Sequence, residues 1–561
     1  MRRSTKLGAS RRKFLTKGAL GIGATALVGV AAQDEAAAQR ITKWDRSADV
    51  VIAGAGASGL CAAIMARDQG ASVIIVEQNH DIGGHAMVSG GRIPLGGGTR
   101  LQKKFGIIDS ADQVYLDHTD FHNLELRYSD HDLVRVWADE NAATFDFLLD
   151  NGVQFDEVMP TLVNEGTVPR LFRTKVYSSD LKVTINGSPG SGLVRALEKS
   201  ARAKGVEILL RHSLTRIVRD DRSGPAFAEA SAGKRVQGIV AKIDNKEVSI
   251  EARRGFIIAT GGFTSNVAFR RMFDPRLTEE YQVAGEPWSK QNADGEMLAM
   301  ALGASLWGTS NVASEHGRSV TKTRHIGARY GYENLRWDPG SPMFPQVGGA
   351  GLTVKSYQDL ICVNQFGKRF WNELDDTYGF LNACLGRHDP DAKAKKLNGG
   401  GPIWAIFDAD SVRREEWEPK PPNVDPNGFF FMADTIAELA RKIANPYQAA
   451  PMPPRTLEET VAKYNSYVDA GKDPEFGRPG LMFKVQKPPF YAAWATPILH
   501  DALTGLRING RCEVLDVRGQ VIPGLYCAGE SAGGFALHGL PRVTVFGRIA
   551  GREAAHARKQ A

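Results

Sequence analysis

Cysteine is scarce in this 561-residue sequence, and its five residues are spread along the chain. No two of them form a CxxC pair, which excludes the usual sequence signature of a zinc site or a dithiol redox pair. The haem-attachment pattern CxxCH is missing as well. If the protein is a redox enzyme, its electrons must therefore come from, or pass to, another molecule.

Acidic residues are slightly fewer than basic ones. Whether the basic excess indicates a nucleic-acid partner depends on where in the chain it lies. Lys and Arg number 70 against 63 Asp and Glu, a formal net charge of +7. Residues 1–38 hold seven basic and two acidic residues, so five of these seven charges lie there. No basic stripe interleaved with aromatic residues follows, so we expect no nucleic-acid partner.

Residues 1–38 also lack a hydrophobic run long and apolar enough to span a bilayer comfortably. Arg11 and Arg12 precede a mildly apolar stretch over 18–32, and three alanines before residue 39 suit cleavage. The pattern resembles a twin-arginine export signal. We expect a signal over 1–38 that is removed after export to the periplasm, leaving no stable membrane insertion. The alternative is a short anchor that stays attached.

A strand–turn–helix pattern follows the N-terminal segment. An apolar run over 50–53 leads into a GxGxxG sequence, apolar residues then recur at helical spacing, and a second apolar run ends in Glu77. Gly54 permits a tight turn, Gly56 lets the backbone approach a pyrophosphate, and Gly59 lets the helix pack on the strand. The helix N-terminus attracts phosphate, and an acid at the position of Glu77 suits a ribose. The sequence predicts a dinucleotide-binding unit, the alternative being a glycine-rich turn in an unrelated α/β unit.

A second glycine-rich stretch, over 79–99, holds seven glycines. Each would cost about 1 kcal/mol relative to Ala inside a helix, so we expect backbone that lies against a flat ring. Its motif IGGHAMVSGG, with the GxGxxG unit and the later ATGGF, resembles the FAD-dependent oxidoreductase 2 superfamily. This superfamily includes fumarate reductases, 3-ketosteroid Δ1-dehydrogenases and tricarballylate dehydrogenases. The resemblance covers essentially the whole chain after the signal.

The resemblance implies an α/β fold in which a Rossmann-like, glutathione-reductase-type FAD-binding domain carries an inserted α+β capping domain. We expect the FAD-binding domain over 39–307 and 496–561, and the capping domain over 308–495, where Pro, Trp and Tyr become frequent. The cofactor is expected to be FAD without a covalent bond, because the spacing from His85 to Gly90 suits the non-covalent branches. Attachment through His85 is the alternative. No metal is expected.

The residues expected to contact FAD come from motifs along the whole chain. Asp294 would also suit the N-cap of a helix over 296–302, and Pro541 the first turn of a helix over 544–558. The free amide groups of that last helix would face the flavin ring. The predicted FAD contacts are Gly54, Gly56, Ala57, Ser58, Gly59, Glu77, Gly83, Gly84, His85, Ser89, Gly90, Gly91, Leu214, Thr260, Gly261, Asp294, Gly529, Glu530, Arg542, Val543 and Thr544.

One departure from the resemblance concerns the proton donor. Fumarate reductases carry Gly-Lys-Arg-Phe-x-Asn-Glu, and an arginine four residues after that glutamate protonates the substrate. Here the motif ends at Glu373 and Leu-Asp-Asp-Thr-Tyr follows it, without the arginine. Ketosteroid dehydrogenases place a tyrosine near this point, a role that Tyr378 would fill. The carboxylate-clamping Asn-Arg-Leu-Gly-Gly-Asn segment is also missing, and Arg542 would replace it in part.

We therefore expect a periplasmic FAD-dependent oxidoreductase that moves a hydride between flavin N5 and a carbon–carbon bond next to a carbonyl or carboxylate. The candidate catalytic residues are Tyr378, His500, His538 and Arg542. One alternative is a fumarate-like reductase with Arg542 or Arg413 as its acid. An alternative of another class is a flavin-binding electron carrier without substrate turnover. The expected partners are a small-molecule substrate and an external electron donor or acceptor, such as a cytochrome or the quinone pool.

Overall fold

The computed structural model describes residues 41, 43–120, 129–162, 166–177, 188–219, 235–307, 320–332, 335–375, 380, 384, 401–481, 483–535, 537 and 539–559. The predicted signal over 1–38 lies outside these residues. Met1–Asp45 and Arg46–Ala561 form separate units, and the second contains every element below. Within the described ranges, no helix combines the length and the apolar character needed to cross a membrane.

An eight-stranded sheet forms the centre of the second unit, with the strand order β20-β21-β8-β1-β2-β5 and with β7 joining β6 to β8. The first strand, β1, pairs in parallel with both β2 and β8, and its last six residues are buried. Buried parallel strands require continuous apolar runs, which explains the run over 50–53. The strand bounds are β1 (Arg46–Ala53), β2 (Val73–Glu77), β5 (Glu207–Leu210), β6 (Ser213–Arg219), β7 (Val236–Ile243), β8 (Lys246–Ile258), β20 (Glu513–Leu515) and β21 (Val521–Cys527).

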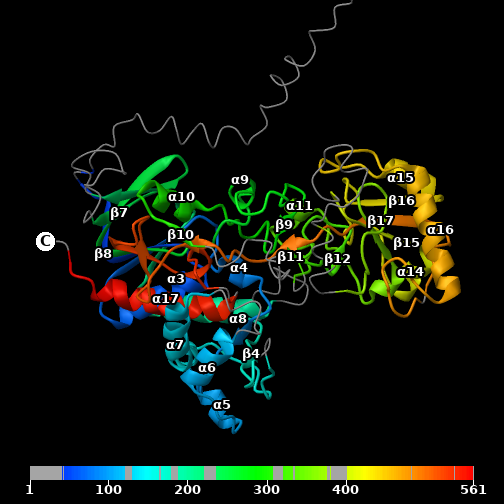
Figure 1. Ribbon diagram of the computed structural model, residues 1–561. Coiled ribbons are helices and arrows are strands. Elements are labelled where there is room, and N and C mark those ends of the chain that lie inside the picture. The colour runs from blue at the N-terminus through cyan, green and yellow to red at the C-terminus, as the bar shows by residue number, and fades with distance from the viewer. Residues whose placement is uncertain are drawn as a thin grey trace, which may run out of the picture. The chain divides into compact units, whose positions relative to one another are not determined.

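Two helices from opposite ends of the chain, α3 (Ala57–Asp68) and α17 (Leu540–His556), pack against each other beside this sheet (Figure 1). A Cβ atom on Gly547 would lie 2.4 Å from the carbonyl oxygen of Ser58, and one on Gly551 would lie 2.1 Å from that of Ala62. Glycine at these two positions is therefore what lets the helices approach so closely. The contact joins residues 540–556 to the GxGxxG unit.

A separate antiparallel sheet lies within the range predicted as the capping domain. Its order is β14-β15-β17-β16, and its apolar core includes Trp404 and Trp494, which contact each other edge to face. The elements here are β14 (Ile361–Val363), β15 (Trp404–Phe407), β16 (Phe430–Ala433), β17 (Phe490–Trp494), η3 (Tyr357–Asp359), α14 (Ala409–Arg414), α15 (Ile436–Lys442) and α16 (Pro454–Ala470). The predicted α/β fold class is confirmed, whereas the domain boundaries stay predictions.

The remaining helices and strands lie outside these two sheets. They are α4 (Gly84–Met87), β3 (Arg92–Pro94), α5 (Arg100–Lys104), α6 (Ala111–Thr119), α7 (His131–Asp150), β4 (Leu171–Arg173), α8 (Pro189–Ala203), α9 (Val267–Arg270), β9 (Gln282–Val283), α10 (Asp294–Ala301), β10 (Leu306–Trp307), β11 (Val320–Thr321), β12 (His325–Ile326), α11 (Phe344–Val347), β13 (Leu352–Thr353), β18 (Ile498–Leu499), β19 (Gly505–Leu506) and η4 (Gly529–Ser531).

Two predicted helix starts need correction. The last helix begins at Leu540 rather than at residue 544, because Pro541 occupies its first turn, where a missing amide hydrogen costs nothing. Helix α10 begins at Asp294, and its N-cap is Ala293 in the left-handed conformation, with φ 66°. Asp294 is therefore not the cap. Its carboxylate lies instead in the first turn, close to the positive end of the helix dipole.

Candidate active site

A pocket opens at the carboxyl ends of β1, β2 and β8, where ligands bind in open parallel sheets. The chain leaving each strand lines it, at Gly54, Glu77 and Ala259 respectively. The predicted FAD contacts that line this pocket are Gly54, Gly56, Ala57, Ser58, Glu77, Gly83, Gly84, His85, Ser89, Gly90, Gly91, Leu214, Thr260, Gly261, Asp294, Gly529, Glu530 and Val543.

The three glycines of the GxGxxG unit have different surroundings. A Cβ atom on Gly54 would lie 2.1 Å from the carbonyl oxygen of Ala259, and one on Gly59 would lie 1.9 Å from that of Gly54. Both positions therefore exclude side chains for reasons internal to the fold. A Cβ atom on Gly56 would meet only the carbonyl oxygen of Gly83, at 3.8 Å. The space beside Gly56 is open to the pocket, which fits close approach by a bound pyrophosphate.

The N-terminus of α3 supplies matching hydrogen-bond donors. Intrahelical bonding begins with Leu60, whose amide donates to the carbonyl oxygen of Gly56, so the amides of the preceding helical residues have no partner within the helix. The Oγ atom of Ser58 is buried beside them and has no hydrogen-bond partner among the described residues. A phosphate placed at this helix end satisfies both kinds of group. The residues present therefore fit the predicted FAD.

Glu77 has a structural task besides the predicted ribose contact. Its carboxylate accepts hydrogen bonds from the backbone amides of Ala55, at 2.7 Å, and Asn79, at 2.9 Å. Burial raises the pKa of Glu77, and these hydrogen bonds oppose that rise. A carboxylate has about four acceptor sites, so these amides leave capacity for a ribose hydroxyl. The predicted contact is compatible with the geometry and stays a prediction.

Another part of the pocket brings together residues from distant segments. The hydroxyl of Tyr332 lies 2.6 Å from Nε2 of His500, and Nδ1 of His500 lies 3.5 Å from a carboxylate oxygen of Asp501. All three residues line the pocket, and we call this part the substrate end. His500 is one of the predicted catalytic residues. Sequence reasoning missed Tyr332, because no motif surrounds it.

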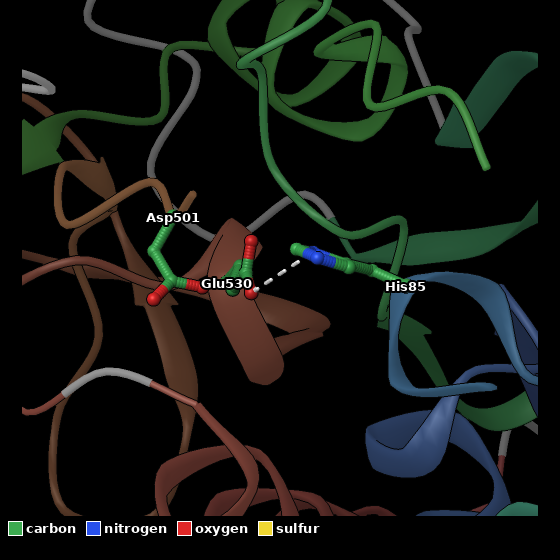
Figure 2. Close-up of side chains that lie close together, drawn as sticks. All are labelled: His85, Asp501 and Glu530. Atoms are coloured by element: carbon green, nitrogen blue, oxygen red, sulfur yellow. Dashed lines mark ion pairs between the residues drawn. The ribbon is translucent and has the colours of Figure 1, made fainter. Parts of the chain in front are cut away.

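A second polar cluster adjoins the substrate end. The Gln291 side-chain amide donates to Glu530 at 2.8 Å and lies 3.5 Å from Nδ1 of His85. Figure 2 shows Glu530 between Asp501 and the His85 ring, and one polar atom of each lies within 4.8 Å of the others. Such a spacing suits a metal ion as well as a shared proton. Gln291 was not predicted, although it lies three residues before Asp294.

Burial shifts the pKa values of His85 and Glu530 in this cluster. Burial lowers the pKa of His85 to about 4, so its ring is neutral near pH 7. Burial and the adjacent Asp501 raise the pKa of Glu530 well above its usual range. Two carboxyl groups this close share protons in place of both ionising. We call Asp501 and Glu530 the carboxyl pair.

Several predicted site residues do not line the pocket. Gly59 packs beneath Gly54, and the hydroxyl of Thr544 donates back to the carbonyl oxygen of Leu540 at 2.8 Å. The Arg542 guanidinium is buried and donates to the carbonyl oxygens of Phe535, at 2.9 Å, and Ala502, at 3.0 Å. The structure therefore does not place Arg542 at the pocket surface, and its roles as an FAD contact and as a partial substrate clamp stay predictions.

The remaining predicted catalytic residues lie elsewhere. Arg413 is 70% exposed on α14 and pairs with Asp410, so the structure does not place it at the pocket as the predicted alternative acid. Tyr378 and His538 lie outside the described residues, and their roles stay predictions.

Comparisons with known proteins agree with this geometry. The family model for the FAD binding domain matches residues 49–542. The acrylate reductase flavoprotein subunit of Shewanella woodyi (strain ATCC 51908 / MS32) is 28% identical over 95% of this chain and 94% of its own length. NADH:acrylate oxidoreductase of Vibrio harveyi is 26% identical over 93% of this chain, which spans only 51% of that relative, about half its length.

A solved structure extends the likeness to the fold. It is 3-ketosteroid-delta4-(5alpha)-dehydrogenase from Rhodococcus jostii RHA1, in complex with 4-androstene-3,17-dione, at 26% identity and a TM-score of 0.57. The alignment covers 92% of this chain and 99% of that one. With the family model matching most of its length, the chain belongs to the FAD binding domain family, within the FAD-dependent oxidoreductase 2 superfamily.

Proposed function

We propose that the protein moves a hydride between the flavin and a carbon–carbon bond activated by an adjacent carbonyl or carboxylate group, and that Tyr332 and His500 handle the accompanying proton. The observation that carries this proposal is the 2.6 Å contact between these two side chains inside the pocket of an FAD-binding chain. The relatives named above, acrylate reductases and a ketosteroid dehydrogenase, act on such bonds by their names. Bound FAD supplies the hydride chemistry at N5.

The arrangement of Asp501, His500 and Tyr332 suits proton exchange. Asp501 lies beside Nδ1 of His500, which favours the tautomer that carries its hydrogen on Nδ1. Nε2 then accepts the hydrogen of the Tyr332 hydroxyl. In the dehydrogenating direction the phenol oxygen takes a proton from the substrate carbon and passes its own to Nε2. In the reducing direction the same steps run backwards.

We also propose that FAD is bound without a covalent bond to the protein. Nδ1 of His85 faces Gln291 and Glu530. Its neutral ring is suited to a polar contact with the flavin. Precipitating the yellow protein in acid should leave all flavin absorbance in the supernatant. Colour that stays with the denatured pellet would instead establish attachment.

We further propose that the protein works in the periplasm after twin-arginine export and exchanges electrons with a separate cytochrome or with the quinone pool. The paired residues Arg11 and Arg12 support export. The absence of CxxCH from the sequence supports a separate electron partner. Replacing both arginines by lysine should retain the protein in the cytoplasm, as judged by fractionation and immunoblotting. Export of that variant would contradict the assignment.

Two alternative functions remain, and one experiment distinguishes them from the proposed function. An electron carrier without turnover has no use for the Tyr332–His500 pair, and a fumarate-specific reductase would accept fumarate in preference to other acceptors. Holoprotein photoreduced without oxygen is mixed with fumarate, acrylate and unsaturated ketones, and oxidised holoprotein with their saturated counterparts. Flavin reoxidation or bleaching by one of these compounds supports the proposal. No response from a fully reducible flavin would favour the carrier.

A further inference from the structure

We infer that Gln291 is a positioning residue that holds the His85 ring in one tautomer, with its hydrogen on Nε2, and thereby makes His85 a hydrogen-bond donor to the flavin. This inference rests on the proposed function, since it assigns the hydrogen bond behind the polar contact between His85 and FAD. It starts from the side-chain amide of Gln291, which lines the pocket and contacts Glu530.

The structure holds this amide in one orientation. The hydroxyl of Thr264 donates to the amide oxygen of Gln291, and the amide nitrogen donates to Glu530 at 2.8 Å. The residue is only 2% exposed, and its backbone exchanges two hydrogen bonds with Ser265. The nitrogen, rather than the oxygen, is therefore the amide atom that faces His85.

The amide nitrogen sets the tautomer of the His85 ring. It lies 3.5 Å from Nδ1 of His85, and because an amide nitrogen can only donate, Nδ1 has to accept. The nearest carboxylate oxygen of Glu530 is 4.0 Å from Nδ1, too far for a hydrogen bond. Burial lowers the pKa of His85 to about 4, so near pH 7 the ring has a single hydrogen. With Nδ1 accepting, that hydrogen lies on Nε2.

The Nε2 atom of His85 is left for a ligand. Among the described residues it has no hydrogen-bond partner, and it is not one of the buried polar atoms that lack a partner. Nε2 is therefore accessible. Because the side chain is only 11% exposed and lines the pocket, this access is from the pocket, where the residues present fit FAD.

The direction of the effect follows from the charge of the reduced flavin. Negative charge develops on the flavin ring when it accepts electrons, and a hydrogen-bond donor stabilises this charge. The other tautomer of His85 would present a lone pair and withhold this stabilisation. By selecting the donor tautomer, Gln291 should therefore raise the midpoint potential of the bound flavin.

The first measurement is the tautomer itself. Holoprotein that carries isotope-labelled histidine is studied by nitrogen NMR, and the His85 signals are those that the His85→Gln variant lacks. We expect a hydrogen on Nε2 and none on Nδ1 in the wild type. In Gln291→Leu, which removes the amide without adding charge, hydrogen on Nδ1 should become detectable.

The second measurement is the midpoint potential, found by anaerobic titration against a dye of known potential. Gln291→Leu should lower the ratio of reduced to oxidised flavin at a fixed potential by about threefold, which equals about 14 mV for a two-electron couple. His85→Phe, which removes the donor itself, should lower that ratio by about tenfold, or about 30 mV. The double variant should match His85→Phe, because Gln291 acts through His85.

Two further variants complete the test. Thr264→Val removes the bond that orients the Gln291 amide, so it should shift the tautomer and the potential in the same direction. It carries the test if Gln291→Leu no longer binds FAD. Gln448→Leu is the matched control, because the Gln448 amide is also hydrogen-bonded at both its oxygen and its nitrogen but does not line the pocket. Its potential and its His85 tautomer should equal those of the wild type.

The outcomes separate this inference from the proposed function. A hydrogen on Nδ1 of His85 in the wild type, or a wild-type potential in both Gln291→Leu and Thr264→Val, would overturn the inference. So would an equal loss of potential in Gln448→Leu. In each case, reoxidation of the photoreduced flavin by an unsaturated acceptor would still support hydride transfer. Failure of every acceptor to reoxidise the flavin would overturn the proposed function, whatever the tautomer of His85.

Discussion

The hydroxyl oxygen of Tyr332 and Nε2 of His500 lie 2.6 Å apart, although 168 residues separate them in the sequence. His500 directly follows β18, which pairs with β11. Thr323, just after β11, donates to the carbonyl oxygen of Gly331, the neighbour of Tyr332. The contact belongs to the tertiary fold, and its disruption should affect turnover more than flavin binding.

Tyr332→Phe is the first variant that follows from this contact. It removes the hydroxyl and keeps the ring, so we expect kcat to fall by roughly 10²–10⁴-fold, the usual contribution of a positioned acid or base. The flavin spectrum should stay unchanged. Tyr330→Phe is the matched control, because Tyr330 does not line the pocket. A wild-type kcat for Tyr332→Phe would remove this residue from the proton path.

The glycines of the first turn make a paired prediction. Gly56→Ala should weaken FAD binding by more than about tenfold without destabilising the apoprotein, because the new Cβ would meet only an oxygen 3.8 Å away. Gly59→Ala should lower the free energy of unfolding by about 1–3 kcal/mol, because its Cβ would lie 1.9 Å from the carbonyl oxygen of Gly54. Flavin titration and urea denaturation of the apoproteins measure the two effects. Equal behaviour of both variants would refute the distinction.

Glu296 provides a prediction about pH. It is fully buried on α10, and burial raises its pKa to about 7 from 4.5. Between about pH 4.5 and 7 the folded protein keeps a proton that the unfolded chain releases, so this group's contribution to stability falls as the pH rises and levels off above about 7. The total loss is about 3 kcal/mol.

Glu296→Gln should abolish that loss. Denaturant unfolding of holoprotein and variant from about pH 5 to pH 8 measures it, and the difference between the two curves isolates Glu296. The buried histidines His85 and His118, whose pKa values burial lowers to about 4, act in the opposite direction in both proteins and cancel. Parallel curves would show that Glu296 does not titrate in this range.

A buried ion cluster in the capping region leads to the last prediction. The Glu373 carboxylate accepts from Arg369, at 2.7 Å, and from Arg478, at 3.0 Å, and all three side chains are at most 2% exposed. Glu373→Gln would leave two buried guanidinium groups short of their counter-charge and should cost about 3–5 kcal/mol. Glu475→Gln, which removes a surface pair with Lys463, should cost less than about 1 kcal/mol. Urea unfolding compares the two, and equal costs would contradict the prediction.

The part of the pocket that the GxGxxG unit forms could be predicted from local sequence. Gly54, Gly56 and Glu77 lie within one strand–turn–helix–strand unit, so their spacing along the chain nearly determines their spacing in space. The same holds for Gly83 and Gly84. Such a contiguous motif can be recognised in a sequence, because each glycine meets a backbone requirement that is set by residues close to it in the chain.

The substrate end could be predicted only in part. His500 was found through its place in the resemblance. Tyr332 depends on tertiary contacts, the β11–β18 pairing and the hydrogen bond from Thr323 to Gly331, which have no period or motif of their own.

The side-chain contacts of Arg542 could not be predicted for a related reason. Arg542 lies in the first turn of α17, and its guanidinium donates to the carbonyl oxygens of Phe535 and Ala502. The local sequence does not encode this rotamer or these partners.

Strand β21 lies between β20 and β8, and α17 packs on α3, so residues 521–556 finish a structure that residues 46–68 begin. A nascent chain therefore leaves the ribosome with the β21-facing edge of β8 uncovered until the final portion has been synthesised. Flavin loading has to follow translation, and a chain cut short before Val521 should be colourless and prone to aggregation.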